Sequence, residues 1–308
     1  MSQPDKSSVT PMCLGPESRV AVVSVLVVFC FAPITRAADA IQIVTAARAV
    51  QPGEVVLFTA TADAPIDALR ARAFDRDLPA FRRDARTWPV VLGIDLDTPA
   101  ASYPVLFDAL VNEHAVDTTI TLAVQRRVFP TRTLRVDDAF VNPPAPILQR
   151  IMSEAAELAR VWTQSAQYRL WGDAFVRPVP GSATSSFGTR SIFNGQPRQP
   201  HGGTDFLSPA GTPIHAPNSG RVVVARDLYF TGNTLVIDHG LGVFSLLAHL
   251  SIIDVHVGDE VTAGQIVGQV GATGRVTGPH LHWAVRIGDA RVDPLAVLAI
   301  LGVSPNRH

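Results

Sequence analysis

This 308-residue sequence has only two cysteines and almost no excess of positive or negative charge. The two cysteines, Cys13 and Cys30, lie near the N-terminus, so the rest of the chain has no thiol and does not depend on disulfides. Its 26 basic and 27 acidic residues give a net charge of −1. This balance argues against nucleic acid as a partner, because nucleic-acid-binding surfaces carry a basic excess. With 47% hydrophobic and 17% charged residues, the composition is typical of a globular protein.

The apolar run at residues 20–34 contains no charge, but it is shorter than the roughly 20 residues that a membrane-spanning helix needs. Arg19 precedes the run and small residues follow it. We therefore interpret residues 1–38 as a signal peptide, with cleavage after Ala37 or Ala40. An uncleaved N-terminal anchor is the alternative. A cleaved signal predicts export to the periplasm or cell envelope, with no membrane association of the mature chain.

Short runs of β-branched and aromatic residues, separated by turn residues such as Pro52-Gly53, follow the signal. They lie at residues 55–59, 90–94, 103–107, 119–124 and 133–136. Regularly spaced short strands of this kind predict an immunoglobulin-like β-sandwich, which we assign as an accessory domain over residues 39–142. No catalytic constellation is visible within it.

A linker and a helix follow this segment. Three prolines at residues 142–146 cannot continue a strand. Beyond them, apolar residues recur at helical spacing and predict a helix over about residues 147–169. These residues are Ile147, Ile151, Ala155, Leu158 and Trp162. We assign residues 143–172 as a helical connector whose apolar stripe packs against a neighbouring domain, with a dimer face as the alternative.

Strand patterns with frequent glycine and proline resume after the connector. Runs at residues 221–225, 234–238 and 243–249 predict an antiparallel sheet, with a hairpin connection at 238–242. We assign residues 173–308 as a C-terminal antiparallel β-sheet domain. The predicted fold is therefore mainly β, with His249 at the end of a strand.

Two short motifs in this domain carry metal-binding chemistry: His201-Gly-Gly-Thr-Asp205 and His280-Leu-His282. Glycine is unfavourable inside a helix, so the first motif is expected to be an extended or turning segment. Residues two apart on a strand project from one face, so His280 and His282 share a face. Between them the motifs offer three side chains for one divalent metal. Two nitrogens and one oxygen suit zinc, and three protein ligands leave a fourth position open, the pattern of catalytic sites.

These motifs, together with the segment Ala248-His249-Leu250, resemble the signatures of the lysostaphin-type (LytM-like) zinc endopeptidases. The resemblance covers roughly residues 175–298. It implies that His201, Asp205 and His282 bind one zinc ion per chain, and that His249 and His280 are unligated catalytic histidines. It also implies a zinc peptidase domain that hydrolyses peptide bonds in peptidoglycan stem peptides or cross-links.

Zinc in such a site activates water, and a nearby imidazole handles the proton or stabilises the oxyanion. No Glu lies beside the ligands as in H-E-x-x-H proteases, so His249 or His280 is expected to do this, without a choice between them. Two alternatives remain open: a non-catalytic activator of another cell-wall hydrolase, and a zinc-bearing wall-binding module. Non-catalytic relatives typically lose zinc ligands. This chain has all three expected ligands and both additional histidines, which favours an enzyme. Protein partners in wall synthesis or division stay undefined.

Overall fold

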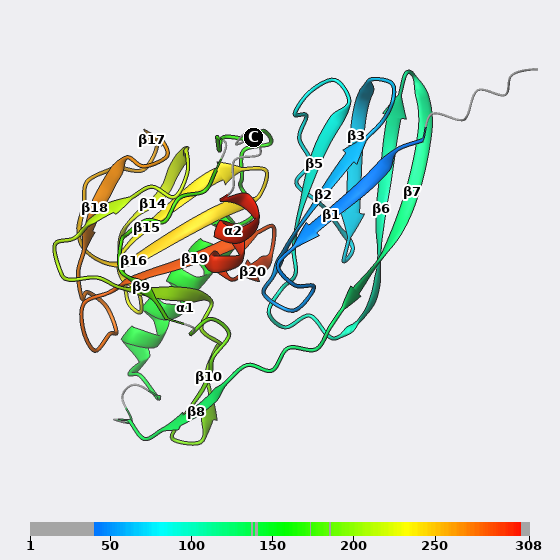
Figure 1. The fold of residues 1–308 in the computed structure, drawn as a ribbon. Helices are drawn as coiled ribbons and strands as arrows, with labels where there is room; N and C mark the ends of the chain where they lie inside the picture. The colour runs from blue at the N-terminus through cyan, green and yellow to red at the C-terminus, as the bar shows by residue number, and fades with distance from the viewer. Residues whose placement is uncertain (1–39, 137, 139–140, 173, 185, 303–308) are drawn as a thin grey trace, which may run out of the picture. The chain divides into compact units, whose positions relative to one another are not determined.

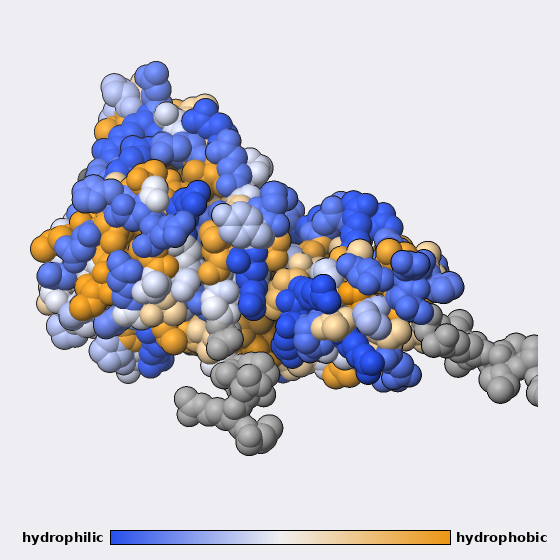
Figure 2. Space-filling view, turned by 90° about the horizontal axis from the view of Figure 1, so that it is seen from above, coloured by the Kyte–Doolittle hydropathy of each residue, from blue (hydrophilic) through white to orange (hydrophobic). Residues whose placement is uncertain are grey.

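The computed structural model describes residues 40–136, 138, 141–172, 174–184 and 186–302. The predicted signal peptide at residues 1–38 lies outside these residues, as do both cysteines. No helix within the described ranges combines the length and the apolar character needed to cross a membrane. On the face shown in Figure 2, hydrophobic residues are interspersed among hydrophilic ones, which is ordinary for a protein surface.

Two antiparallel sheets form the first part of the chain (Figure 1). The first has the order β1-β2-β5, from β1 (Gln42–Ala47), β2 (Val55–Thr61) and β5 (Thr87–Gly93). The second has the order β4-β3-β6-β7, from β4 (Arg76–Asp77), β3 (Ile66–Ala73), β6 (Ala101–Val111) and β7 (His114–Val124).

The inner faces of these two sheets share one hydrophobic core. Phe58 of β2 and Phe107 of β6 are fully buried there and meet edge to face, with ring centroids 5.6 Å apart. This pairing of two small antiparallel sheets confirms the predicted sandwich. The prediction missed β1 and β3, because β1 is mostly exposed and β3 carries arginine and alanine in place of β-branched residues.

The strand predicted at residues 133–136 does not belong to the sandwich. It corresponds to β8 (Thr131–Leu134), which pairs in parallel with β10 (Arg190–Phe193). β10 also pairs with β11 (Gln196–Pro197). Local sequence identified the strand but not its partner, which comes from a distant part of the chain. The end of the segment assigned to the accessory domain therefore contributes a strand that pairs with β10.

The connecting helix is shorter than predicted. α1 (Ala145–Val161) begins after Pro144, and the prediction extended it to residue 169. Beyond the helix, the backbone N–H of Ala166 donates a hydrogen bond of 2.8 Å to the carboxylate of Asp238. Local helical periodicity could not reveal this distant acceptor, which fixes the segment in a non-helical conformation.

The apolar stripe of α1 packs against the outer face of the C-terminal sheet. Trp162, at the end of the helix, meets Phe244 edge to face with ring centroids 5.3 Å apart. Leu158 and Val161 join the same small cluster. The predicted packing role of the stripe is therefore confirmed (Figure 1).

The C-terminal part is built on one large sheet whose central strands are all antiparallel. The main path runs through β17 (Glu260–Val261), β14 (Gly220–Leu228), β15 (Gly232–Gly240), β16 (Val243–Ile253), β19 (Leu281–Ile287), β12 (Gly203–Leu207) and β9 (Ser182–Ala183). Off this path lie β13 (Pro213–His215), β18 (Ile266–Val270) and β20 (Ala290–Val292), and α2 (Pro294–Leu301) follows. This arrangement confirms the predicted antiparallel sheet.

A buried polar chain anchors the centre of this sheet. The indole N–H of Trp283 donates to Ser245 Oγ over 3.2 Å, and Ser245 Oγ lies 2.9 Å from His239 Nε2. His239 Nδ1 lies 2.8 Å from the carbonyl oxygen of Ser219 and donates to it. The Ser245 hydroxyl can then donate to Nε2, so the neutral imidazole is fully satisfied. Burial lowers the pKa of His239 to about 4. Trp283 and its neighbour His282 are thereby held from behind the sheet.

Candidate metal centre

The register between two strands brings the expected ligands together. Asp205 on β12 lies directly opposite His282 on β19. His201 lies two residues before β12 begins, so its side chain reaches the same end of the sheet. On the other side of β19, His282 is paired with Ala248 of β16, which places His249 beside the group. Of the segment 201–205, predicted to be extended or turning, residues 203–205 lie in the strand β12.

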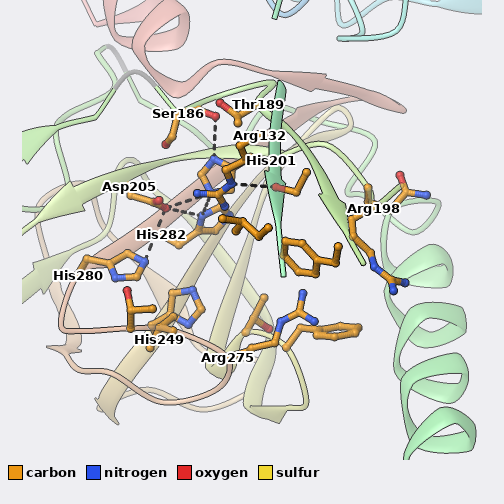
Figure 3. A pocket seen from close by; sticks show the side chains of 18 of the residues that line it. Arg132, Ser186, Thr189, Arg198, His201, Asp205, His249, Arg275, His280 and His282 are labelled. Atoms are coloured by element: carbon orange, nitrogen blue, oxygen red, sulfur yellow. Dashed lines mark hydrogen bonds and ion pairs between the residues drawn. The ribbon is translucent and has the colours of Figure 1, made fainter. Parts of the chain in front are cut away.

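Three donor atoms converge at this point (Figure 3). His201 Nε2 lies 3.0 Å from His282 Nδ1 and 3.2 Å from Asp205 Oδ1. His282 Nδ1 lies 2.9 Å from Asp205 Oδ1. A tetrahedral zinc ion with bonds of about 2.0 Å has donor atoms roughly 3.3 Å apart. The triangle is therefore close to the size that zinc requires.

The protonation of these groups also fits a cation. His201 Nδ1 lies 3.2 Å from the Ser186 carbonyl oxygen and donates to it, so Nε2 of the neutral ring carries a lone pair. The three converging atoms are all hydrogen-bond acceptors when unprotonated. At most one of them, His282 Nδ1, then carries a proton that it can donate to the other two. Such a convergence of acceptors is costly unless a cation occupies it. The donor set, two nitrogens and one oxygen, is one that zinc prefers.

The pKa values of the ligand side chains follow from this crowding. Burial acts to raise the pKa of Asp205, but hydrogen bonds with His201 and His282 outweigh it and hold the pKa well below its usual range. Burial lowers the pKa of His282, and the neighbouring His201 adds to this effect. An ionised carboxylate and a neutral imidazole are the forms that bind metal.

His249 and His280 lie beside the triangle without being part of it. Their ring centroids are 4.9 Å apart, and His280 Nε2 is 3.8 Å from Asp205 Oδ1. His249 Nδ1 donates to the Thr273 carbonyl oxygen over 2.9 Å, and His280 Nδ1 donates to the Gly278 carbonyl oxygen over 2.9 Å. These bonds leave the Nε2 atom of each neutral ring free to accept a proton.

The backbone at His249 departs from the prediction that it ends a strand. His249 lies within β16, and its φ of 67° falls in the left-handed region that residues other than glycine rarely adopt. Strained conformations of this kind cluster at functional sites. Burial lowers the pKa of His249 to about 4, and positive charge on His282 would lower it further. The ring is therefore neutral near pH 7.

Asp293 supports β12 from the side opposite the site. Its carboxylate caps α2 by accepting a hydrogen bond of 2.9 Å from the backbone N–H of Leu295. The same carboxylate accepts from the Thr204 hydroxyl at 3.2 Å, and it forms an ion pair with Arg48 at 2.9 Å. Thr204 precedes the ligand Asp205, so these contacts fix the strand that carries the carboxylate.

A cleft of about 760 Å³ opens over the metal centre. Besides the five expected residues, its walls include Arg132, Arg198 and Arg275, none of which we predicted to be functional. They come from three separate segments and form no motif in the sequence. Only the folded structure brings them to one cleft.

Comparisons with known proteins point to one family. The model of Peptidase family M23 matches residues 199–294, which contain all five expected site residues. The crystal structure of a peptidase M23 from Pseudomonas aeruginosa is 31% identical over 81% of this chain and 95% of that chain, with a TM-score of 0.62.

Two curated relatives match over the C-terminal region. Peptidoglycan DD-endopeptidase ShyA of Vibrio cholerae is 49% identical over 84 residues, which is 27% of this chain and 20% of that protein. DD-carboxypeptidase/endopeptidase Mpg of Neisseria meningitidis is 41% identical over 97 residues, 32% of this chain and 22% of that protein. The matched region thus spans about a fifth of the length of each relative. Since a solved relative is matched over nearly its whole length, and the family model covers both metal motifs, the chain belongs to peptidase family M23.

Proposed function

We propose that this protein is a zinc-dependent endopeptidase that hydrolyses peptide bonds in peptidoglycan stem peptides or cross-links. The observation that carries the proposal is the convergence of His201 Nε2, Asp205 Oδ1 and His282 Nδ1 within 3.2 Å of one another. Two further histidines lie beside this triangle in an open cleft. Membership of family M23, and relatives named as peptidoglycan endopeptidases, support the substrate class.

His201, Asp205 and His282 would hold one zinc ion per chain. Three protein ligands leave one tetrahedral position for water or substrate. When bound, zinc supplies Lewis-acid activation of water and polarisation of the scissile carbonyl. The deprotonated carboxylate of Asp205 and the hydrogen bond from His201 to Ser186 orient the ligands for this role.

His249 and His280 would manage the proton. Each ring is fixed by a backbone carbonyl at Nδ1, so each Nε2 can accept a proton from the attacking water. The imidazole that takes the proton becomes a donor, which can stabilise the developing oxyanion or pass the proton to the leaving amine. We assign both residues to catalysis without choosing which is the base.

The remaining parts of the chain fit the same proposal. Residues 1–38 would direct export to the periplasm or cell envelope, where peptidoglycan is found. Residues 39–142 would form an accessory domain, and residues 143–172 would connect it to the peptidase domain at 173–308. The accessory domain would position substrate, bind a partner or occlude the cleft.

Zinc analysis combined with digestion of purified peptidoglycan tests the proposal. We expect one zinc per chain, release of soluble peptides, loss of both after chelation, and recovery with added zinc. The variant His282→Ala should lose zinc and activity, whereas His256→Ala, in an exposed loop, should retain both. A wild-type protein that holds zinc but leaves peptidoglycan intact would instead be a binding module or an activator of another hydrolase.

A further inference from the structure

The cleft over the metal centre is strongly cationic. Arg132 comes from β8, Arg198 follows β11, and Arg275 lies in the loop between β18 and β19. Among the described residues that line the cleft, Asp205 is the one carboxylate, and it belongs to the metal centre. Figure 3 shows Arg198 and Arg275 on the side of the cleft away from His280.

The guanidinium group of Arg275 packs against two aromatic rings and has no carboxylate partner among the described residues. Its Cζ lies 4.5 Å from the ring centroid of Phe230 and 5.7 Å from that of Phe193. Stacking of this kind fixes the plane of the group and leaves its N–H edge available. Burial lowers the pKa of Arg275, and the positive charge of Arg198 lowers it further. Both effects disfavour the charged side chain until an anion approaches.

Arg198 also lies near Phe193, with its Cζ 6.0 Å from the ring centroid. The Nη2 atom of Arg198 donates a hydrogen bond to the Val141 carbonyl oxygen over 3.1 Å. Its Nε is buried and has no hydrogen-bond partner. A buried donor left unsatisfied is costly and calls for an explanation, such as a missing ligand.

Arg132 completes the set from β8. Its Nε donates to Ser191 Oγ over 3.0 Å, which orients the guanidinium within the cleft. Within the described ranges, none of the three cleft arginines forms an ion pair with a carboxylate. About half of the other described arginines do, including Arg48, Arg70, Arg150, Arg221, Arg226 and Arg291. The three guanidinium groups that line the cleft are therefore not neutralised by carboxylates of the described chain.

We propose that Arg198 and Arg275, assisted by Arg132, bind a free carboxylate of the substrate and make the enzyme select anionic peptides over neutral ones. This inference rests on the proposed peptidase function and specifies its substrate class. The guanidinium group forms paired, charge-assisted hydrogen bonds with carboxylates, and both Arg198 and Arg275 lie near the ring of Phe193. A neutral peptide, such as a glycine bridge, would leave the cationic cleft uncompensated.

A matched pair of substrates tests this proposal. The probes are a cross-linked peptide dimer released from peptidoglycan with its carboxylates free, and the same dimer with those carboxylates converted to carboxamides. The readout is the ratio of kcat/KM for the two probes. We expect the wild-type enzyme to prefer the free carboxylates by about tenfold to a hundredfold, the usual range for a hydrogen bond to a charged group.

The variants Arg198→Gln and Arg275→Gln should bring this ratio close to one, and Arg132→Gln should reduce it less. Arg275→Lys should keep part of the preference, because it keeps the charge but loses the paired donors. The matched control is Arg221→Gln, an exposed arginine outside the cleft that pairs with Glu260. It should keep the wild-type ratio. An unchanged ratio in both Arg198→Gln and Arg275→Gln would overturn the proposal.

Calorimetric binding separates failure of this inference from failure of the proposed function. Both probes are titrated into the zinc-loaded His249→Asn variant, with and without the added Arg275→Gln change. Tighter binding of the free carboxylates that depends on Arg275, without cleavage by the wild type, would support recognition and contradict the peptidase function. Cleavage of both probes at equal rates, with equal binding, would support the peptidase function and contradict carboxylate recognition.

Discussion

The two adjacent glycines of the metal motif allow a sharp test of how the ligands are positioned. A Cβ atom at Gly203 would lie 2.4 Å from the Trp283 carbonyl oxygen and 2.8 Å from His282 Nε2. A Cβ atom at Gly202 would meet nothing within 4 Å. Gly203→Ala is therefore the perturbation, and Gly202→Ala is a matched control one residue away. The contacts at Gly203 are with backbone and with a ligand ring, so the strand pair β12–β19 must separate.

The magnitude follows from these distances. Ordinary van der Waals contact begins at about 3.4 Å, so the Trp283 carbonyl must move by roughly 1 Å. Overpacking of this size costs about 1–3 kcal/mol of stability. A disturbed ligand orientation typically lowers metal affinity about tenfold to a hundredfold, and a misplacement of roughly 1 Å lowers activity about a hundredfold. We expect Gly202→Ala to leave zinc affinity unchanged.

Competitive zinc titration, with circular dichroism to confirm folding, measures the effect. The expected order of zinc affinity is wild type equal to Gly202→Ala, and both well above Gly203→Ala. Folded Gly203→Ala protein with wild-type zinc affinity would refute the idea that the close β12–β19 approach positions His282. Equal losses in both variants would show that the motif needs glycine for a different reason.

Three further predictions concern the catalytic histidines, acid stability and the helix contact. His249→Asn, in which Asn tolerates the left-handed backbone, should keep zinc but lower peptidoglycan hydrolysis about a hundred- to ten-thousand-fold; loss of zinc from the folded variant would make His249 a ligand. The pKa of His239 is lowered from 6.5 to about 4, so the unfolded chain binds more protons between these values. The free energy of unfolding should therefore fall by up to about 3 kcal/mol as the pH drops through this window, which urea titrations measure. An NMR titration that shows His239 becoming protonated near pH 6.5 would contradict the lowered pKa. Phe244→Ala should destabilise by about 3–5 kcal/mol in thermal or urea unfolding, because it removes the buried ring that Trp162 contacts; a change below about 1 kcal/mol would contradict that packing.

Much of the fold could be predicted because its signals are local. Runs of β-branched residues identified β2, β5, β14, β15 and β16, and the helical spacing of apolar residues after the prolines identified α1. The errors arose where tertiary contacts override local preference. The end of α1 depends on the distant carboxylate of Asp238, and the placement of β8 depends on pairing with β10.

The candidate metal centre was also accessible from sequence, since its expected ligands lie in two short motifs whose spacings have a simple geometric meaning. The register that pairs Asp205 with His282 then supplies the convergence. The left-handed backbone of His249 left no sequence signal, because a histidine inside an apolar strand looks regular. Arg132, Arg198 and Arg275 were missed for a different reason: isolated arginines are common on surfaces, and only the fold brings these three to one cleft.

The central claim is that this chain cuts peptide bonds in peptidoglycan with the zinc held by His201, Asp205 and His282. Mass spectrometry of cross-linked peptide dimers, incubated with zinc-loaded or metal-free protein, tests it most directly. The account predicts that zinc-loaded protein converts dimers to fragments that have each gained one water at a single peptide bond, and that metal-free protein leaves them intact. Intact dimers with fully zinc-loaded, folded protein, or identical fragments from metal-free protein, would contradict the claim.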